Sequence, residues 1–424
     1  MTIDPDTRLP LTSSSIADVI GAEGGRVTFA RFMDLALTHP TLGYYSRVDR
    51  LLRHGGDFNT APALSPFFNR TVARLVTELV DASLAGESAP AESRPVESAP
   101  AESSTAAAAR GRPAVVELGG GEGHLAEGIL RFWAKERPEL REKLSYRIVE
   151  VGAGLRERQA AAVGRLMAAG WDVGWGWDLE EACAGTRPAV IVGNEFLDAL
   201  PVHLVNVEET TMREAYVESA HAGLAQTWGA VSDDAAAEIE LLFGRLDPGR
   251  LEGLTEDGIL EISPGLGDLV RQVADVMPSG SFVNIDYGEW FPDLVSSQGP
   301  ACACQVWGLE GRARRRRTVR GYFKHQMVTD PLARAGSQDL TADVDFGALD
   351  LHGRLAGFET VLFTTLAAFQ RGGGAEDELR ALRDGSTETA SDTLEADRQA
   401  TVLTKLLDEQ DLGGAFKVMV QVKE

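Results

Sequence analysis

The sequence contains little cysteine, no long apolar run and no apolar core of a leader peptide. Its three cysteines, Cys183, Cys302 and Cys304, are an odd number in a chain of 424 residues, which argues against a disulfide framework. No stretch approaches the roughly 18 uninterrupted apolar residues of a membrane span, so we expect no membrane partner. The first residues include Asp4 and Asp6 and lack the character of a secretion or organelle signal. We therefore expect a cytoplasmic location.

Several patterns typical of hydrolases, kinases and metalloproteins are also absent. The sequence has no G-x-S-x-G turn and no G-x-x-x-x-G-K-[ST] loop. Its seven histidines form no cluster at metal-ligand spacing, and the Cys302-x-Cys304 pair has no further ligand group beside it. We therefore expect no metal site and neither hydrolase nor kinase chemistry.

Basic residues are outnumbered. The 64 acidic and 41 basic residues give a formal charge of −23, which repels nucleic acid over most of the surface. One basic run, from Arg312 to Arg317, is interpreted as a solvated loop rather than a phosphate contact. We expect no nucleic-acid partner and a neutral or cationic substrate.

Apolar spacing predicts helices first and then alternating strands and helices. Apolar residues at helical spacing predict a helix within 28–37, and Ser65 with Pro66 provides the N-cap and first turn of another. A helical segment at 153–168 separates two of the later strands. The strands are expected at 114–118, 146–151, 188–193, 281–287, 358–364 and 415–422. This alternation predicts an α/β fold with a parallel, doubly wound sheet.

The composition divides the chain into segments. SAPAES occurs twice in a stretch rich in Ala, Ser, Pro and Glu, a composition that cannot bury enough apolar surface to order itself. Two long connections between strands are expected to build a cap over the sheet. The segments are an N-terminal helical region at 1–85, a disordered linker at 86–112, a cofactor-binding core at 113–204, a cap insertion at 205–277, and the completion of the core sheet at 278–424 with a second cap insertion at about 288–345.

A glycine-rich turn joins the first core strand to the following helix. Glycines in such a turn let the backbone approach a ligand and aim helix N–H groups at its polar end. Gly119, Gly121 and Gly123 form G-x-G-x-G, whereas the dinucleotide fingerprint requires a glycine at position 124, where His124 stands. The spacing favours S-adenosyl-L-methionine over NAD as the cofactor, on a Rossmann-like sheet of the S-adenosylmethionine methyltransferase type.

Acidic residues surround this turn. Glu150 ends the next strand, 27 residues after Gly123, where a carboxylate can accept hydrogen bonds from both ribose hydroxyls. Glu117 precedes the turn and strengthens the prediction of a nucleoside site. Asp178, after the Trp171–Trp177 segment, is a candidate for the adenine amino group; a solvated or capping aspartate is an equal alternative.

Two further carboxylates follow the strand at 188–193. Ligands of open α/β sheets bind at the carboxyl ends of strands, so Glu195 and Asp198 are expected near the transferred methyl. They can hold a guanidinium or orient an amine or hydroxyl; the alternative is that they only cap a helix. His325 is the candidate base for a neutral hydroxyl acceptor, with a structural or surface histidine as the alternative.

The motifs resemble those of the MidA family of S-adenosylmethionine-dependent methyltransferases, which includes a protein arginine methyltransferase. The resemblance runs nearly from end to end, and GDF-x-TAP and NEF-x-DALP are its most specific elements. The matching segments are FARFMDLALTHPTLGYYSR at 29–47, GGDFNTAPALSPFF at 55–68, VVELGGGEGHL at 115–125, IVEV at 148–151, LRERQ at 155–159, NEFLDALPVH at 194–203, LEISPGL at 260–266, NIDYGEW at 284–290, TVRGYFKHQMVTDPLARAGSQDLTADVDF at 318–346 and GGAFKVMVQV at 413–422.

The resemblance implies roles for individual residues. Asp57, Phe58 and Thr60 would lie over the cofactor, and Glu195 and Asp198 would line the acceptor pocket. The residues that would bind the cofactor are Gly119, Gly121, Gly123 and Glu150.

These observations favour an enzyme that methylates a nitrogen of an arginine side chain on a partner protein. O- or N-methylation of a small metabolite is the second hypothesis, and a non-catalytic assembly factor with a nucleoside site is the third. The acceptor is thus a protein or a small molecule, and a homodimer is one option for the assembly.

Overall fold

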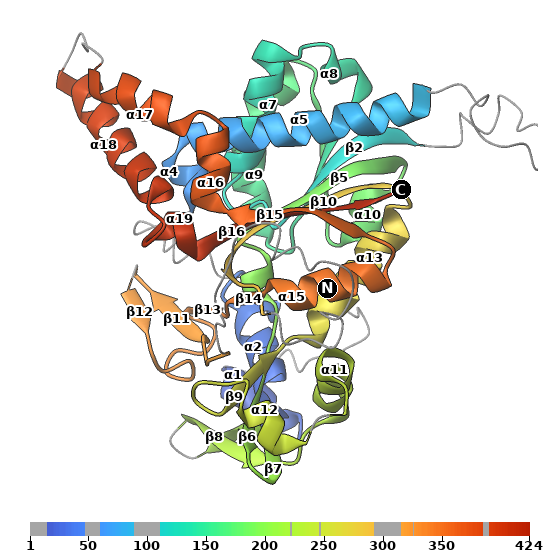
Figure 1. The fold of residues 1–424 in the computed structure, drawn as a ribbon, viewed down its shortest axis with the longest axis vertical. Coiled ribbons are helices and arrows are strands. Elements are labelled where there is room, and N and C mark those ends of the chain that lie inside the picture. Colours follow the sequence, from blue (N-terminus) through green and yellow to red (C-terminus); the bar gives the residue numbers. More distant parts are fainter. Residues whose placement is uncertain are drawn as a thin grey trace, which may run out of the picture.

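The computed structural model describes residues 15–46, 60–88, 111–220, 223–245, 247–291, 315–324, 326–384 and 390–424. Its largest sheet has eight strands: β2 (Arg112–Leu118), β3 (Ser145–Val149), β4 (Asp172–Gly176), β5 (Thr186–Asn194), β10 (Gly280–Glu289), β14 (Val344–Asp345), β15 (Glu359–Thr365) and β16 (Phe416–Lys423). The order is β15-β16-β10-β5-β2-β3-β4, with β14 beside β10. Figure 1 labels β15, β16, β10, β5 and β2 of this sheet. Only the two pairings made by β16 are antiparallel.

Helices cover both faces of this sheet. One face carries α5 (Pro66–Ser88), α7 (His124–Glu136) and α9 (Ala153–Ala168); the other carries α10 (Leu179–Cys183), α13 (Pro264–Val276) and α15 (Phe346–Leu355). The alternation along β2 shows the two faces, because Val115 packs in the cluster of the first three helices while Ala114 and Val116 pack in that of the others. The predicted α/β doubly wound fold is confirmed, including the expected strands and the helix at 153–168, whereas the last strand, β16, runs antiparallel to both of its neighbours.

The predicted start of α5 is confirmed, because Ser65 caps the helix as expected. The hydroxyl of Ser65 accepts a hydrogen bond from the N–H of Phe68 at 3.2 Å, and Pro66 occupies the first turn. At the other end of α5 the described chain stops at Ser88 and resumes at Gly111, next to β2. Residues 89–110, most of the expected linker, lie outside the described residues.

A second sheet contains five strands: β1 (Arg26–Thr28), β6 (His203–Glu208), β7 (Thr211–Ala220), β8 (Gly223–Gly229) and β9 (Ile259–Ile262). The N-terminal region is therefore not purely helical, because β1 lies between α1 (Ile16–Ala22) and α2 (Phe29–Thr38) and pairs with β7. The helices α1 and α2 pack on this second sheet, whereas α5 packs on the central one. The domain boundaries themselves remain predictions.

The remaining elements lie beside these two sheets (Figure 1). A third sheet is formed by β11 (Arg320–Phe323), β12 (Gln326–Val328) and β13 (Asp339–Thr341). Between β15 and β16 come α16 (Leu366–Gly372), α17 (Ala375–Asp384), α18 (Ala390–Leu407) and α19 (Leu412–Ala415). The remaining helices are α4 (Ala61–Leu64), α8 (Leu140–Lys143), η3 (Leu197–Ala199), α11 (Asp233–Phe243) and α12 (Pro248–Glu252). Within the described ranges, no helix combines the length and apolarity that crossing a membrane requires.

Candidate functional site

A cavity of about 620 Å³ opens at the carboxyl ends of β2, β3 and β5. Its volume lies within the range of small-molecule sites. The glycine turn and the ends of β3 and β4 form one end of its wall, and residues of β5, β10, β11 and β13 form the other. The cavity therefore joins the central sheet to the third sheet.

The glycine turn has a backbone that other residues adopt rarely. Gly119, Gly121 and Gly123 have φ angles of 64°, 50° and 87°. A Cβ on Gly119 would lie 2.7 Å from the ring of Phe196, so this position also leaves no space for a side chain. Gly123 is the N-cap of α7, whose first N–H groups therefore begin beside the cavity.

Glu150 lies at the end of β3, where the sequence predicted an acidic side chain. The carboxylate is buried and accepts hydrogen bonds from the N–H of Gly152 at 2.8 Å and from Nε2 of Gln159 at 3.0 Å. Burial raises its pKa above the ordinary value, against the effect of these two hydrogen bonds. Each of its oxygens has one of these partners, which leaves lone pairs for further donors such as ribose hydroxyls.

Gln159 has no role predicted from the sequence, yet it contacts both the glycine turn and Glu150. It is fully buried in α9, and its Nε2 also donates to the carbonyl of Gly121 at 2.9 Å. Its Oε1 accepts from the indole of Trp175 at 2.8 Å. The sequence feature that could have indicated Gln159 is the LRERQ segment at 155–159, which carries part of the family resemblance. A single sequence does not show which side chain of this segment points towards the glycine turn.

Glu117 and Asp178 both line the cavity. Glu117 is buried, accepts a hydrogen bond from Tyr146 Oη at 2.8 Å, and has a pKa raised by burial to about 7. Asp178 caps α10 by accepting the N–H of Glu181 at 2.8 Å. Asp178 therefore caps a helix and also lies at the cavity wall. The predicted contact with the adenine amino group and the alternative capping role are compatible.

Not every predicted residue can be placed. Thr60 lines the cavity as the N-cap of α4. Asp57, Phe58 and His325 lie outside the described residues, as does the Cys302-x-Cys304 pair. In the part of the chain that the structure describes, no three His, Cys, Asp or Glu side chains are grouped to hold a metal ion.

Glu195 follows β5 directly, in a backbone conformation unusual for a side chain larger than glycine. Its φ is 51°, and Asn194 Nδ2 donates to its carboxylate at 3.1 Å. Desolvation, and then the charge of Asp198, raise its pKa to about 8, whereas hydrogen bonds from Asn194 and the backbone of Ala61 oppose that rise. Ala61 belongs to the TAP motif, so the two most specific segments of the resemblance meet at this carboxylate.

Asp198 is buried in η3 and lines the same cavity. Its carboxylate accepts a hydrogen bond from the hydroxyl of Tyr287. Desolvation raises its pKa to about 6, while the Tyr287 hydrogen bond and the charge of Arg320 act in the opposite direction. Since the two carboxylates face one cavity, a cation bound there would favour the ionised form of both.

A third carboxylate, Asp286, accepts N–H groups of η3, and Asp198 itself accepts a backbone hydrogen bond from Ala199. Asp286 of β10 accepts the N–H groups of Leu197 at 2.9 Å and Asp198 at 3.2 Å. Asp286 is buried, and burial together with the charges of Asp198 and Glu195 raises its pKa well above the ordinary value. From the sequence alone, Asp286 is expected in a strand and has no predicted function.

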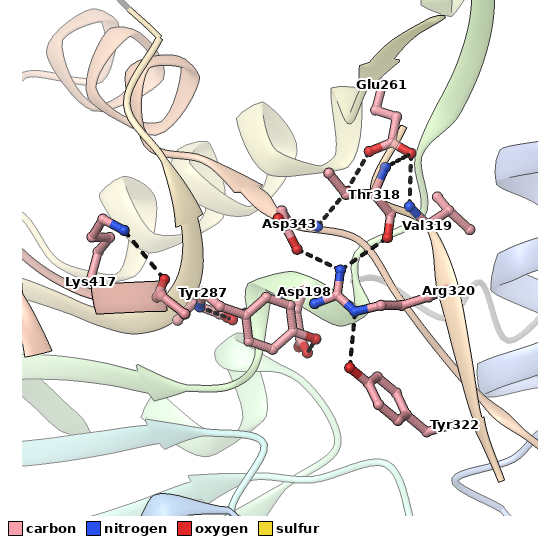
Figure 2. Close-up of polar contacts among 11 residues, drawn as sticks. Asp198, Glu261, Tyr287, Thr318, Val319, Arg320, Tyr322, Asp343 and Lys417 are labelled. Atoms are coloured by element: carbon pink, nitrogen blue, oxygen red, sulfur yellow. Dashed lines mark hydrogen bonds and ion pairs between the residues drawn. The ribbon is translucent and has the colours of Figure 1, made fainter. Parts of the chain in front are cut away.

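Tyr287 and Arg320 were also missed, although both line the cavity. The guanidinium of Arg320 lies 4.7 Å from the centre of the Tyr287 ring and donates to Asp343 Oδ1 at 2.6 Å (Figure 2). Both belong to segments of the family resemblance, NIDYGEW and TVRGYF. A single sequence could not show that β10 and β11 bring them to one wall.

Comparison with known proteins gives one family match. Residues 102–364 match a family described as "Putative S-adenosyl-L-methionine-dependent methyltransferase". Among solved structures, a Burkholderia thailandensis protein bound to S-adenosyl-homocysteine is 27% identical with a TM-score of 0.69, over 96% of this chain and 92% of that one. A second B. thailandensis structure is 28% identical, with a TM-score of 0.67 over 96% and 91% of the two chains.

Similar proteins of known name are protein arginine methyltransferases. The mitochondrial protein arginine methyltransferase NDUFAF7 of Danio rerio is 25% identical over 84% of this chain and 75% of its own length. The Mus musculus protein of the same name is 26% identical over 87% and 75%. Because these relatives are named as mitochondrial, the expected cytoplasmic location is wrong. Compartment depends on targeting signals, about which neither the fold nor the site is informative.

Proposed function

This chain belongs to the MidA family of S-adenosyl-L-methionine-dependent methyltransferases, and we propose that it methylates a nitrogen of an arginine side chain on a partner protein. The observation that carries the proposal is the pair of desolvated carboxylates, Glu195 and Asp198, on the wall of the cavity. The names of the NDUFAF7 relatives support the same class of acceptor.

The cofactor of this family supplies an electrophilic methyl group on a positively charged sulfur. We assign its nucleoside part to the end of the cavity formed by the glycine turn and Glu150. The fit is supported by the open space at Gly121, where a Cβ would meet no protein atom within 4 Å, and by the unused lone pairs of the Glu150 carboxylate. Gln159, which donates hydrogen bonds to both, would hold that carboxylate and the glycine turn in fixed positions relative to each other. Glu117 and Asp178 would complete the wall around the nucleoside.

The other end of the cavity suits a cationic acceptor. Carboxylates can hold a planar guanidinium through charge-assisted hydrogen bonds that fix its orientation. Burial makes ionised Glu195 and Asp198 costly, and a bound guanidinium would offset that cost. A methyl acceptor held in this way presents its nitrogen in one orientation, which is the main contribution a protein can make to methyl transfer.

The overall charge supports a basic partner. A formal charge of −23 produces a field that attracts arginine-rich surfaces and repels nucleic acid. This field affects the rate of encounter and not the choice of the reacting atom, which depends on the carboxylates.

The proposal is tested with isotopically methyl-labelled cofactor. The protein is incubated with this cofactor and a cell lysate, labelled proteins are hydrolysed, and the amino acids and free metabolites are examined by mass spectrometry. We expect label on arginine nitrogen, and none when the protein is heat-denatured beforehand. Label confined to a small metabolite, or to another amino acid, would overturn the arginine proposal while leaving the methyltransferase family unaffected.

A further inference from the structure

Arg320 is held in place by three parts of the protein. Its Nη1 donates to Asp343 Oδ1 at 2.6 Å and to the carbonyl of Thr318 at 3.0 Å, and its Nε donates to Tyr322 Oη at 2.9 Å (Figure 2). The guanidinium therefore has partners for both its Nε and its Nη1 before any ligand binds. Arg320 also forms an ion pair with Asp343. Because its charge is paired in this way, Arg320 competes less with a cationic acceptor for the carboxylate of Asp198.

The strand that carries Arg320 is anchored to the second sheet. Glu261 of β9 accepts the N–H groups of Thr318 at 2.7 Å and of Val319 at 2.9 Å, and it also accepts the hydroxyl of Thr318 (Figure 2). Because these contacts fix the residues just before β11, the position of Arg320 is set by the fold rather than by its own flexible side chain.

Tyr287 connects this fixed guanidinium to the site. Its ring packs against Arg320 at 4.7 Å and against the edge of the Phe416 ring at 5.3 Å, so its orientation is restrained by two neighbours. Its hydroxyl donates to the carboxylate of Asp198. Among the polar contacts of Glu195 in the described chain, none joins it to Tyr287 or Arg320.

We propose that Arg320 and Tyr287 are positioning residues that hold Asp198 as the fixed anion for the acceptor guanidinium. The carboxylate without this clamp, Glu195, then receives the proton that the reacting nitrogen loses. This inference rests on the proposed arginine methylation and assigns different tasks to the two carboxylates.

The chemical step balances with these assignments. The acceptor nitrogen forms the bond to the methyl carbon, and the electron pair of the carbon–sulfur bond stays on sulfur. The nitrogen's proton passes to the ionised carboxylate of Glu195, so the methylated guanidinium keeps one positive charge. Asp198 remains ionised and paired with the guanidinium throughout, and Glu195 releases the proton to solvent when the product leaves.

The electrostatics of the site agree with this division. Desolvation raises the pKa of both carboxyl groups, to about 6 for Asp198 and to about 8 for Glu195. The Tyr287 hydrogen bond and the Arg320 charge favour ionised Asp198, whereas the charge of Asp198 opposes ionisation of Glu195. Two neighbouring acids whose environments separate their pKa values commonly have different roles in catalysis. The titratable and charged groups that face Asp198 are Tyr45, Glu195, Asp286, Tyr287, Arg320 and Asp343.

The test measures binding of a short arginine peptide with blocked ends, whose guanidinium stays charged at every pH used. The protein is saturated with S-adenosyl-homocysteine, and peptide affinity is measured by calorimetry from pH 5 to pH 8.5. We expect the wild-type affinity to fall as Asp198 becomes protonated. In Tyr287→Phe and Arg320→Met the midpoint of this fall should move up by about one pH unit, because each change removes a group that favours the anion.

Matched variants separate this effect from general damage. Arg320→Lys keeps the charge and should restore much of the wild-type midpoint. Tyr216→Phe and Arg245→Met, which remove the same groups from the second sheet and from the exposed residue after α11, should leave it unchanged. Asp198→Asn should weaken peptide binding at high pH, whereas Glu195→Gln should lower kcat by a much larger factor than it weakens peptide binding.

Two failures are distinguishable. If the wild-type protein binds no arginine peptide at any pH, the proposed acceptor is wrong, and the division of roles falls with it. The other failure is that the peptide binds with a pH midpoint of affinity that is the same in Tyr287→Phe, Arg320→Met and the wild type. In that case the positioning role of Tyr287 and Arg320 is wrong, and arginine recognition stands.

Discussion

The side-chain amide of Gln159 donates a hydrogen bond of 3.0 Å to the carboxylate of Glu150. The same nitrogen donates to the carbonyl of Gly121 at 2.9 Å, and Trp175 holds the other end of the amide. The acid at the end of β3 and the glycine turn after β2 are therefore linked by one buried side chain. This linkage makes Gln159 a residue on which cofactor affinity should depend even without direct contact.

We predict that Gln159→Leu lowers the affinity for S-adenosylmethionine by about tenfold. The change removes donors to Glu150 and Gly121, and one hydrogen bond to a charged group is worth about 1.5–3 kcal/mol. Calorimetric titration measures the affinity, and Gln399→Leu on α18 is the matched control. Equal affinities for both variants would show that the glycine turn and Glu150 hold their positions without this link.

Glu150→Ala should weaken cofactor binding by at least about tenfold while the fold is retained. The change removes the carboxylate that we assign to the ribose hydroxyls, and charged acceptors contribute about 1.5–3 kcal/mol each. The same titration is used, together with circular dichroism to check folding. Glu136→Ala, at the exposed end of α7, serves as control; an unchanged affinity in Glu150→Ala would mean that the ribose binds elsewhere.

The glycine spacing predicts selectivity between cofactors. We expect S-adenosylmethionine and S-adenosyl-homocysteine to bind with micromolar dissociation constants, about −8 kcal/mol, and NAD not to bind detectably. Competition calorimetry decides between them. Tighter binding of NAD would contradict the cofactor assignment, because the departure from the dinucleotide fingerprint at His124 is its main support in the sequence.

Glu117 should make the protein less stable as the pH rises. Its pKa in the folded protein is raised by burial to about 7 from an ordinary 4.5, so the folded state keeps a proton that the unfolded chain loses between these values. The free energy of unfolding therefore falls across this window, on the order of 3 kcal/mol for this group. Glu117→Gln cannot ionise and can still accept the Tyr146 hydrogen bond.

This variant should therefore have a higher Tm than the wild type at pH 8 and nearly the same Tm at pH 4.5. Differential scanning calorimetry at the two pH values makes the comparison, with the exposed substitution Glu136→Gln as control. A Tm of Glu117→Gln below that of the wild type at pH 8 would show that the ionised carboxylate stabilises the fold.

The sequence predicted the parts of the fold that follow local patterns. The strand, glycine turn and helix around Gly121 are contiguous, so composition and spacing suffice to locate them. Strand β1 was missed because three residues are too few to show alternation within a region of helical spacing. The N-terminal contribution to the second sheet depends on pairing with β7, almost 200 residues away, and no local pattern records it.

In the candidate site, the sequence likewise predicted the residues that follow core strands and missed those that pairing of distant strands brings in. Glu150, Glu195 and Asp198 each follow a core strand, where the carboxyl-end rule applies. By contrast, Asp286 and Tyr287 reach η3 from a strand that lies 89 positions further along the chain. Their importance comes from parallel pairing of β10 with β5, which a single sequence does not reveal.

The most direct test of the account is the kcat/KM for an arginine acceptor in Glu195→Gln and Asp198→Asn. These substitutions keep size and hydrogen-bonding capacity but remove the charges that a guanidinium needs. We predict that each lowers kcat/KM by ~100-fold or more, because Asp198→Asn removes the fixed anion that orients the guanidinium and Glu195→Gln removes the group that accepts the proton of the reacting nitrogen. Cofactor affinity should change little, and Asp234→Asn, an exposed carboxylate of α11, should behave like the wild type. Wild-type kcat/KM in both active-site variants would contradict the account and remove Glu195 and Asp198 from the acceptor pocket.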